Sequence, residues 1–564
     1  MSSKRNKKRD LTALLLAIII VILLNITGSF IFHRFDLTSE KRYTLSDATK
    51  KLLATIDETV YVKVYLEGEF PAGFKRLRNE TKEMLDEFRT YSNNNIEYEF
   101  INPSENPDKK QQNEVYAQLY EKGLQPFNVE NKSDDGTTQQ VIWPGALVSY
   151  HGVEAPWSLL KTSMGYSAEG QLNNSIQALE YEFASTIRNL SVTKRNQVGF
   201  LEGHGELDTL AVEDIKNALG EFYTLKRVAI NGQLKALDGL DALVIAKPDT
   251  TFSKQDKFVI DQFIMKGGKV LWCIDPLETR LDSLARSGKT LAVPYPLEID
   301  DMLFKYGARI NTDMVLDLQS SALPVNTAYA GQQPKVELKP WIYAPVILPT
   351  NKHPIVKNLD VIKFEFTGSI DFVDAPGITK TVLLTTSKNS KVLNAPVRVD
   401  MRIMRFQQDE AQFKDAFKPV AVLLEGEFES VYKNKIASKE ILNDSAIGYR
   451  DHGVNTKMII ISDGDVIRND IQTSSGKPYP LGFDKYTNQQ FGNKNFILNC
   501  MNYLCDDSGL ISVRSRELTL RLLDKKKAKL DRFKWQMINT LVPLLLVLVY
   551  GLIHYIRRKR KYAK

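Results

Sequence analysis

The chain has 564 residues, of which 43% are hydrophobic and 25% charged, a globular composition that excludes both wholesale disorder and a transporter with many membrane spans. Its formal net charge of +7 is concentrated beside two apolar runs, so the charge does not indicate a nucleic-acid-binding surface. The three cysteines, Cys273, Cys500 and Cys505, are too few for a disulfide-stapled fold. We expect them to be buried, inert thiols.

The first apolar run predicts a membrane-spanning helix at residues 11–32. It holds no charged residue, and at about 1.5 Å per residue it covers the ~30 Å hydrocarbon layer. A cleaved signal peptide is the alternative, but the run is longer than an ordinary signal core and no clear small-x-small cleavage site follows it. The cations in residues 1–10 indicate a cytoplasmic N-terminus.

The second apolar run predicts another span at residues 535–556, with aromatic rings toward its ends, where the interface favours them. Residues 511–534 predict a basic juxtamembrane helix that lies along anionic headgroups, docks on a partner or is simply solvated. Two spans return the C-terminal tail, residues 557–564, to the cytoplasm. We therefore expect a two-pass protein of the cell inner membrane with most of its chain in the periplasm.

Residues 33–165 predict a small α/β unit. A short helix capped by Ser46 comes first, and strand patterns with period two then alternate with helical patterns. The order β-α-β-α-β-β resembles a thioredoxin-like layout. The unit contains no cysteine, so thiol redox chemistry is excluded for it.

Residues 166–510 predict a larger α/β domain. Apolar strands alternate with helices, which indicates a mostly parallel sheet covered on both faces. At about 277–418 the pattern is less regular and is interrupted by prolines, which indicates an insertion or a β-rich elaboration. Two more apolar strands and a helix follow, and we expect them to complete the same sheet.

Six polar residues that follow apolar strands form the candidate ligand-binding set. Open α/β sheets bind ligands at the carboxyl ends of parallel strands, and an imidazole with several carboxylates suits a divalent cation or acid-base chemistry. Acidic residues after strands also cap helices and form turns, which is the simpler interpretation. The six are Glu202, His204, Glu206, Asp275, Asp463 and Asp465.

Other chemical motifs are incomplete. The SGKT string at residues 287–290 lacks the first glycine of a phosphate-binding loop, because Ser283 stands at that position. Cys273 lies within a strand rather than on a strand-to-helix elbow, and the six histidines show no metal-ligand spacing. We therefore predict no catalytic residue, no metal, no cofactor and no nucleic-acid partner.

Several long strings are specific to one family. They include RFDLTSEKRYTLSDATKKLL, FLEGHGE, GGKVLWCIDPLE, ISDGDVIRND and GNKNFILNCMNYLCDD. Over nearly its whole length the chain resembles the GldG family of gliding-motility-associated ABC transporter auxiliary proteins of Bacteroidetes. The resemblance implies that the sheet domain is similar to the ABC-transporter auxiliary domain, related to class I glutamine amidotransferases but without a catalytic cysteine elbow.

The resemblance also implies a separate permease, a cytoplasmic ATPase and a role in gliding motility. Family members carry a substrate-binding label that names no cargo. We therefore predict a non-catalytic, membrane-anchored subunit of an ABC transporter whose periplasmic domain binds a partner or cargo. The alternatives are a membrane-tethered hydrolase or amidotransferase-like enzyme, suggested by the strand-end residues, and a purely structural envelope scaffold.

Overall fold

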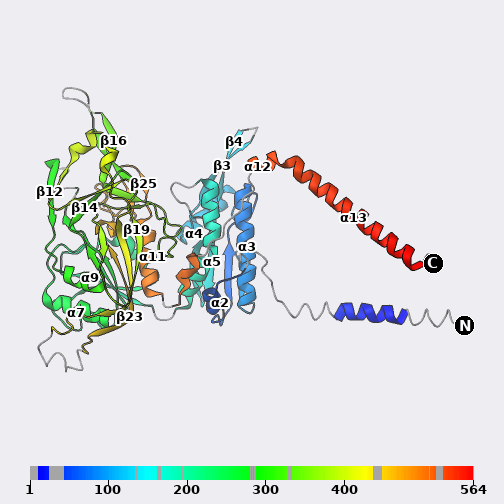
Figure 1. Ribbon diagram of the computed structural model, residues 1–564, viewed down its shortest axis with the longest axis horizontal. Helices are drawn as coiled ribbons and strands as arrows, with labels where there is room; N and C mark the ends of the chain where they lie inside the picture. Colours follow the sequence, from blue (N-terminus) through cyan, green and yellow to red (C-terminus); the bar gives the residue numbers. More distant parts are fainter. Residues whose placement is uncertain are drawn as a thin grey trace. The chain divides into compact units, whose positions relative to one another are not determined.

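The computed structural model describes residues 11–23, 44–133, 136–161, 167–192, 195–279, 281, 284, 287–327, 333, 335–435, 448–506, 508–515 and 525–562 (Figure 1). The chain divides into two units, residues 1–516 and residues 517–564. The first unit contains every β-strand among the described residues, and the described part of the second consists of helices.

The first unit begins with a small sheet of order β2-β1-β5-β6, in which β1 pairs in parallel with β2 and antiparallel with β5. Its elements are α2 (Asp47–Leu53), β1 (Val60–Val64), α3 (Ala72–Tyr91), β2 (Ile96–Phe100), α4 (Lys109–Glu121), β3 (Phe127–Ser133), β4 (Gly136–Ile142), β5 (Gly145–Tyr150), β6 (Val153–Ser158) and α5 (Ala168–Ser191). The hydroxyl of Ser46 accepts from the Thr49 N–H at 3.2 Å, which confirms the predicted cap. The mixed α/β character is confirmed, whereas the thioredoxin-like classification stays a prediction.

The main sheet has the order β19-β22-β23-β10-β9-β7-β8. Its strands are β7 (Gln197–Glu202), β8 (Thr224–Ala229), β9 (Ala242–Ala246), β10 (Lys269–Cys273), β19 (Ile378–Thr385), β22 (Pro419–Glu429) and β23 (His452–Ile461). Strands β8, β7, β9, β10 and β23 run parallel to one another, whereas β22 runs antiparallel to both of its neighbours, β23 and β19. The sheet is therefore mixed, with one strand, β22, that runs against its two neighbours.

Both faces of the main sheet are covered. Leu271 of β10 faces a core shared with α6 (Glu213–Gly220) and α11 (Asn493–Cys505), while its neighbour Trp272 faces a second core shared with α7 (Lys254–Met265) and α9 (Asp300–Tyr306). Successive side chains of a strand point to opposite faces, so a strand buried on both sides is apolar throughout. This explains the continuous apolar runs in the sequence.

Between the main-sheet strands β10 and β22, short antiparallel sheets surround a separate core that includes Met314, Trp341, Tyr343 and Phe366. The short elements are β11 (Leu277–Glu278), β12 (Lys289–Pro294), β13 (Ala308–Ile310), β14 (Asp313–Asp317), β15 (Ser320–Asn326), β16 (Val336–Ile347), β17 (Ile362–Lys363), β18 (Ile370–Phe372), β20 (Ser390–Asn394), β21 (Val397–Asp400), η1 (Met401–Arg405) and η2 (Glu410–Gln412). After β23 come η3 (Asp465–Ile467), β24 (Phe483–Asp484) and β25 (Gln489–Gln490).

The chain then returns to the small N-terminal sheet. Leu510, Ile511 and Val513 of η4 (Leu510–Ser515) are buried in the same core as Leu45. Residues 511–515 were predicted to begin a juxtamembrane helix. They form a docked 3₁₀ helix instead, because their apolar side chains fill this core.

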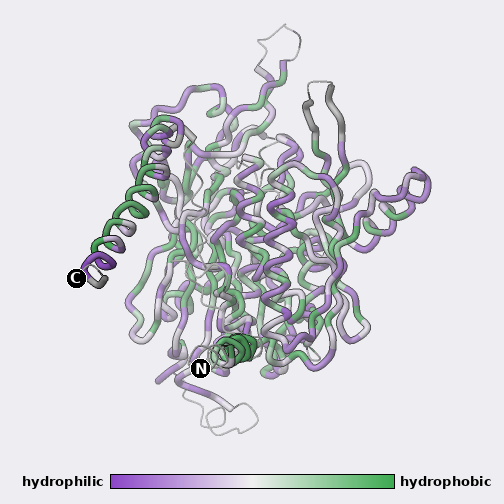
Figure 2. The backbone as a smooth tube through the Cα atoms, turned by 90° about the vertical axis from the view of Figure 1, so that its right-hand side faces the viewer, coloured by the Kyte–Doolittle hydropathy of each residue, from purple (hydrophilic) through white to green (hydrophobic). Residues whose placement is uncertain are grey.

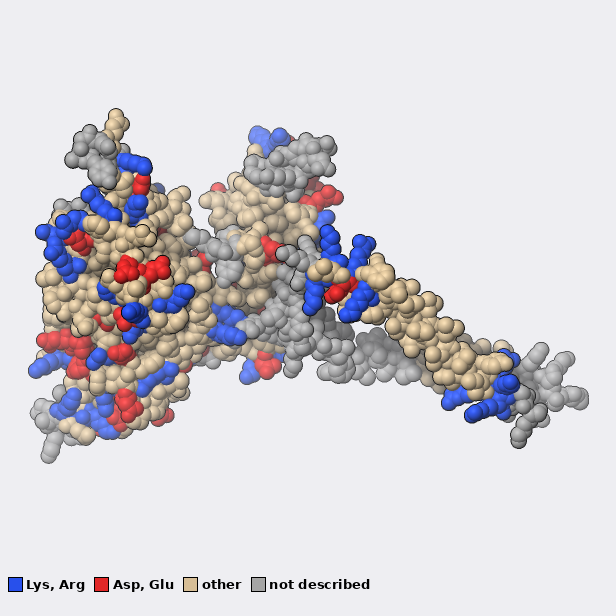
Figure 3. Space-filling model, turned by 45° about the horizontal axis from the view of Figure 1, so that its top comes forward, with Lys and Arg blue, Asp and Glu red and all other residues tan. Residues whose placement is uncertain are grey.

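The second unit contains α12 (Lys525–Leu530) and α13 (Arg532–Tyr562). Residues Arg532–Arg560 form one helix that is long and apolar enough to cross a membrane, and Leu11–Leu23 forms a shorter apolar helix. Figure 2 shows the apolar stretch of α13, and Figure 3 shows the basic side chains that end it. The remainder of the first predicted span, residues 24–32, lies outside the described residues.

Candidate functional site

The candidate residues lie at the carboxyl edge of the main sheet, Glu202 at the end of a strand and the others on loops. Because β7, β9, β10 and β23 are parallel neighbours, the loops that follow them meet at one edge. Strand β7 leads to Glu202, His204 and Glu206, β10 leads to Asp275, and β23 leads to Asp463 and Asp465. The loop after β9 adds Lys247, which the sequence analysis did not single out.

Two of the predicted carboxylates pair with the buried ammonium group of Lys247. Its Nζ lies 2.8 Å from Asp275 Oδ2 and 2.5 Å from Asp465 Oδ2. Asp463 stands beside them, and its Oδ1 accepts from the Asp465 backbone N–H at 2.6 Å. Arg468 Nε lies 3.0 Å from Asp465 Oδ1, a contact with the geometry of an ion pair rather than a hydrogen bond.

The charges in this network are interdependent. Burial opposes the charge of Lys247, but Asp275 and Asp465 outweigh burial and raise the pKa of its ammonium group. Burial raises the pKa of Asp275, which Lys247 opposes, whereas Arg468 and Lys247 overcome burial and lower the pKa of Asp465. Burial and the two neighbouring carboxylates raise the pKa of Asp463 well above its usual value. The two cations therefore balance Asp275 and Asp465.

The three carboxylates place oxygens within 4.8 Å of one another, which is a spacing that a cation site requires. The Lys247 ammonium group already contacts two of them at hydrogen-bond distance. A divalent cation among these oxygens would meet that positive charge at close range. The residues fit an internal ion-pair network and do not fit a divalent-cation site.

His204 is held between two carboxylates in a second cluster. Its Nδ1 lies 3.2 Å from Glu206 Oε1, its Nε2 lies 3.1 Å from Asp256 Oδ2, and its ring stacks on Phe252 at 3.9 Å between centroids. Burial opposes the imidazolium charge, but Glu206 and Asp256 outweigh burial and raise the pKa of His204. Asp256 lies in the first turn of α7, so the cluster ties the loop after β7 to that helix.

Glu202 belongs to neither cluster. It pairs with Arg227 of β8, and its side chain is 43% exposed. Arg227 also donates to the Leu207 carbonyl at 2.9 Å. The structure thus divides the six predicted residues into an aspartate-lysine network, a histidine cluster and one surface ion pair.

Comparisons with known proteins place this sheet in a family. A family model described as an ABC-type uncharacterized transport system matches residues 195–500, which is more than half of the chain. The chain belongs to this ABC transporter auxiliary family. The auxiliary domain, as residues 195–500 are called below, contains every predicted site residue. A second model, described as a domain of unknown function, matches residues 39–149.

An uncharacterized protein of Borreliella burgdorferi is 21% identical to this chain over 581 residues, and the match covers 99% of this chain and 100% of that protein. Among solved structures, the mmIFT52 N-terminal domain matches with 13% identity and a TM-score of 0.31. That match covers 55% of this chain and 99% of the solved chain.

The strand-end groups of the auxiliary domain are already paired with one another. Both ring nitrogens of His204 already face carboxylates, so neither is available as a general base. The Cys273 thiol is buried, and burial raises its pKa well above the usual value. The described groups of this edge hold four loops together and leave no activated nucleophile among them.

Three members of these clusters were missed from the sequence. Lys247 follows the apolar strand β9, so the strand-end rule that selected the carboxylates would have selected it as well. The local sequence around Asp256 indicates only a helix cap, and its backbone N–H does donate to the Ser253 hydroxyl at 3.0 Å. Its contact with His204 joins residues 52 positions apart, and no local pattern encodes that distance. Arg468 carries no sequence signal of its role.

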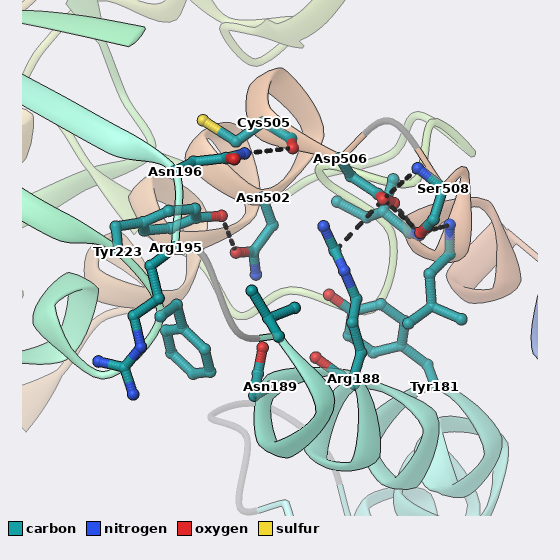
Figure 4. A pocket seen from close by; sticks show the side chains of 15 residues that line it. Tyr181, Arg188, Asn189, Arg195, Asn196, Tyr223, Asn502, Cys505, Asp506 and Ser508 are labelled. Atoms are coloured by element: carbon teal, nitrogen blue, oxygen red, sulfur yellow. Dashed lines mark hydrogen bonds and ion pairs between the residues drawn. The ribbon is translucent and has the colours of Figure 1, made fainter. Parts of the chain in front are cut away.

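A cavity of about 210 Å³ lies where α5 meets the auxiliary domain (Figure 4). Its lining is largely polar and includes Asn189, Arg195 and Asn502. The Tyr223 hydroxyl donates to Asn502 Oδ1 at 2.7 Å, and the Asn196 amide donates to the Cys505 carbonyl at 3.0 Å. These bonds join the start of the main sheet to the end of α11.

A larger hollow of about 940 Å³ lies among β16, η1 and the loop that follows η1. Ile342 and Met404 form part of its apolar floor, while Glu337 and Lys339 belong to its polar rim. Phe406, also in its lining, is 71% exposed. This hollow is lined by residues of the auxiliary domain and lies apart from the strand-end residues.

Proposed function

We propose that this protein is a non-catalytic, membrane-anchored subunit of an ABC transporter. Its auxiliary domain binds a protein partner or a cargo rather than transforming a substrate. One observation carries the proposal. In a domain of a transport-associated family, the edge where α/β sheets usually bind ligands is filled by the domain's own ion pairs.

Anchoring is the next part of the proposal. The helix Arg532–Arg560 supplies one span, and the apolar helix Leu11–Leu23 is the described part of a second, at residues 11–32. Cations before the first run and after the second support a cytoplasmic location for both termini. The protein is then a two-pass component of the inner membrane, with residues 33–534 in the periplasm.

The partners are a polytopic permease and a cytoplasmic ATPase. No Asp, Glu, Lys or Arg lies within residues 11–32 or 535–556, so the predicted spans supply no ion path of their own. The family strings support a role in gliding motility and a place among the GldG proteins of Bacteroidetes. The unit at residues 33–165 is thioredoxin-like in this proposal, and the six strand-end residues position loops for partner binding.

Co-purification tests this function. The full-length protein, tagged and extracted from its native membrane in mild detergent, is expected to recover a permease and an ATPase. Leu546→Arg places a charge within the second span at a cost of about 2.5–3.5 kcal/mol for insertion, so this control variant should lose both partners. Repeated recovery of the wild-type chain alone, from a membrane fraction that contains the permease, would refute the proposal.

The enzyme alternative has one observation in its favour, the contact of His204 with Glu206 and Asp256. It predicts hydrolysis of glutamine or a simple ester by the purified full-length protein, and loss of that hydrolysis in His204→Gln. We expect no hydrolysis by either protein. Turnover that depends on His204 would replace the transport-subunit proposal with an amidotransferase-like enzyme.

A further inference from the structure

Helix α5 holds the segment that connects the small N-terminal sheet to the first predicted span. Leu45 is buried in the core beneath α5, and the Ser46 N–H donates to Glu180 Oε1 at 2.7 Å. The Thr49 hydroxyl donates to the same oxygen at 2.9 Å. The chain therefore reaches the folded body at Glu180.

The same helix holds the segment that leads toward the second predicted span. Arg188 of α5 pairs with Asp506 at 3.2 Å, and Asp506 accepts from the Ile511 N–H at 2.9 Å. The guanidinium of Arg514 lies 5.2 Å from the ring centroid of Tyr181, also on α5. Figure 4 shows Tyr181, Arg188 and Asp506 gathered at this point.

These two connections meet at one place. Glu180 and Tyr181 are consecutive residues of α5, with Cα atoms about 3.8 Å apart. Helices α2 and η4 also contact each other and both pack on α5. The chain thus arrives and departs at one corner, formed by α2 and η4, although Thr44 and Ser515 lie far apart in sequence. The auxiliary domain lies between these two residues in the sequence, so the chain leaves this α2–η4 corner, forms the auxiliary domain and returns to the corner.

We propose that the α2–η4 corner is the surface that faces the lipid bilayer. The small N-terminal sheet then lies next to the membrane, and the part of the auxiliary domain around β12 lies farthest from it. Figure 1 shows β12 on the far side of the main sheet from α5. This inference rests on the proposed two-pass anchoring and adds an orientation to it.

The length of the N-terminal connection supports this orientation. Residues 33–43 separate the first predicted span from Thr44, and a fully extended chain of this length covers about 40 Å. A compact body made of residues 44–515 has a radius of gyration of about 23 Å, so it measures about 60 Å across. The connection is too short to pass around the body. A connection of about 40 Å cannot reach the far third of a body about 60 Å across, which supports placing the corner on the membrane side.

Two single-cysteine variants of the full-length protein test the orientation. Lys51→Cys places a label on exposed α2, and Lys289→Cys places one on exposed β12. Both replace surface lysines, and the native cysteines are buried and do not compete for label. Each labelled protein is reconstituted into phosphatidylcholine vesicles that carry an energy acceptor on a fraction of their headgroups.

The donor at position 51 is expected to lose several-fold more of its emission to the lipid acceptor than the donor at position 289. Equal or greater transfer from position 289, in protein that floats with the vesicles, would overturn the orientation and leave the anchoring intact. Protein that fails to float with the vesicles would overturn the two-pass anchoring and the orientation with it. The vesicle flotation assay separates these two failures.

Discussion

Lys247→Met removes the charge at the centre of the strand-end network while keeping most of the side-chain volume. Asp275 then loses its cationic partner at 2.8 Å, whereas Asp465 keeps Arg468 at 3.0 Å. Removing one member of a buried ion pair costs about 3–5 kcal/mol. This is a large share of the 5–15 kcal/mol that stabilises a typical folded domain.

The pH dependence of this loss follows from Asp275. Burial raises the folded pKa of Asp275, and without Lys247 to oppose burial that pKa rises further above the unfolded value. A group whose pKa is raised in the folded protein contributes less to the free energy of unfolding as the pH rises above its unfolded pKa. The deficit of Lys247→Met should therefore shrink as the pH falls from 7.5 to 5.5, by at most about 1.36 kcal/mol per pH unit.

Urea unfolding of the full-length protein in detergent, followed by intrinsic fluorescence, measures the effect, because buried Trp272 belongs to β10 beside the network. Lys235→Met, at an exposed lysine of the same domain, should stay within about 0.5 kcal/mol of wild type. Adding Asp275→Asn to Lys247→Met should restore at least half of the loss at pH 7.5. A Lys247→Met protein as stable as the Lys235→Met control, or a deficit that does not change with pH, would refute the ion-pair assignment.

Three further predictions concern the same domain. Glu206 and Asp256 raise the pKa of His204. The stability that His204 contributes is therefore complete below its unfolded pKa of about 6.5 and is lost as the pH rises through its folded pKa. In urea titrations, His204→Gln should be most destabilised near pH 6 and should approach the stability of the wild type near pH 8. Gly205→Ala should cost at least about 2 kcal/mol more than Gly239→Ala in the same titrations, because both glycines have positive φ but only at Gly205 would the new Cβ overlap a neighbouring carboxylate; equal costs would contradict this. All three cysteines should resist a thiol reagent in the native protein and react fully in urea, since each is buried, and fast labelling of native protein would disprove their burial.

Sequence patterns predicted the elements where local physics decides them. The Ser46 cap and the apolar strands β9, β10 and β23 follow from side-chain hydrogen bonding and strand periodicity, and the structure has them at the predicted places. Such patterns could not predict the direction of β22, because the hydrophobic pattern of an apolar strand is the same whichever way the strand runs in the sheet. Residues 511–515 were misassigned for a related reason. Their apolar side chains fit a helix or a docked turn equally well until the core that receives them is known.

The sequence predicted that the candidate residues lie at one edge of the sheet but did not predict the contacts they make there. Strand-end logic located Asp275, Asp463 and Asp465 at one edge, and they do lie together. Their role depends on Lys247, whose backbone has a positive φ of 55° in the loop after β9. That conformation is uncommon for a residue with a side chain and is held only by the surrounding loops. A single sequence shows that Lys247 follows β9, but not that its ammonium group lies between Asp275 and Asp465.

The closed edge also bears on where this protein meets its partners. In a ligand-binding α/β sheet, the loops after the strands leave a crevice, and binding energy comes from groups that await the ligand. Here the ammonium group of Lys247 occupies the end of the strands, and the contact of His204 with Asp256 holds the loop after β7 against α7. A ligand that displaced Lys247 from Asp275 or Asp465 would leave a buried charge without its partner, at a cost of about 3–5 kcal/mol. A ligand at this edge would have to recover that cost before any affinity appeared, so we expect a partner to bind elsewhere on the domain, for example at the hollow beside β16.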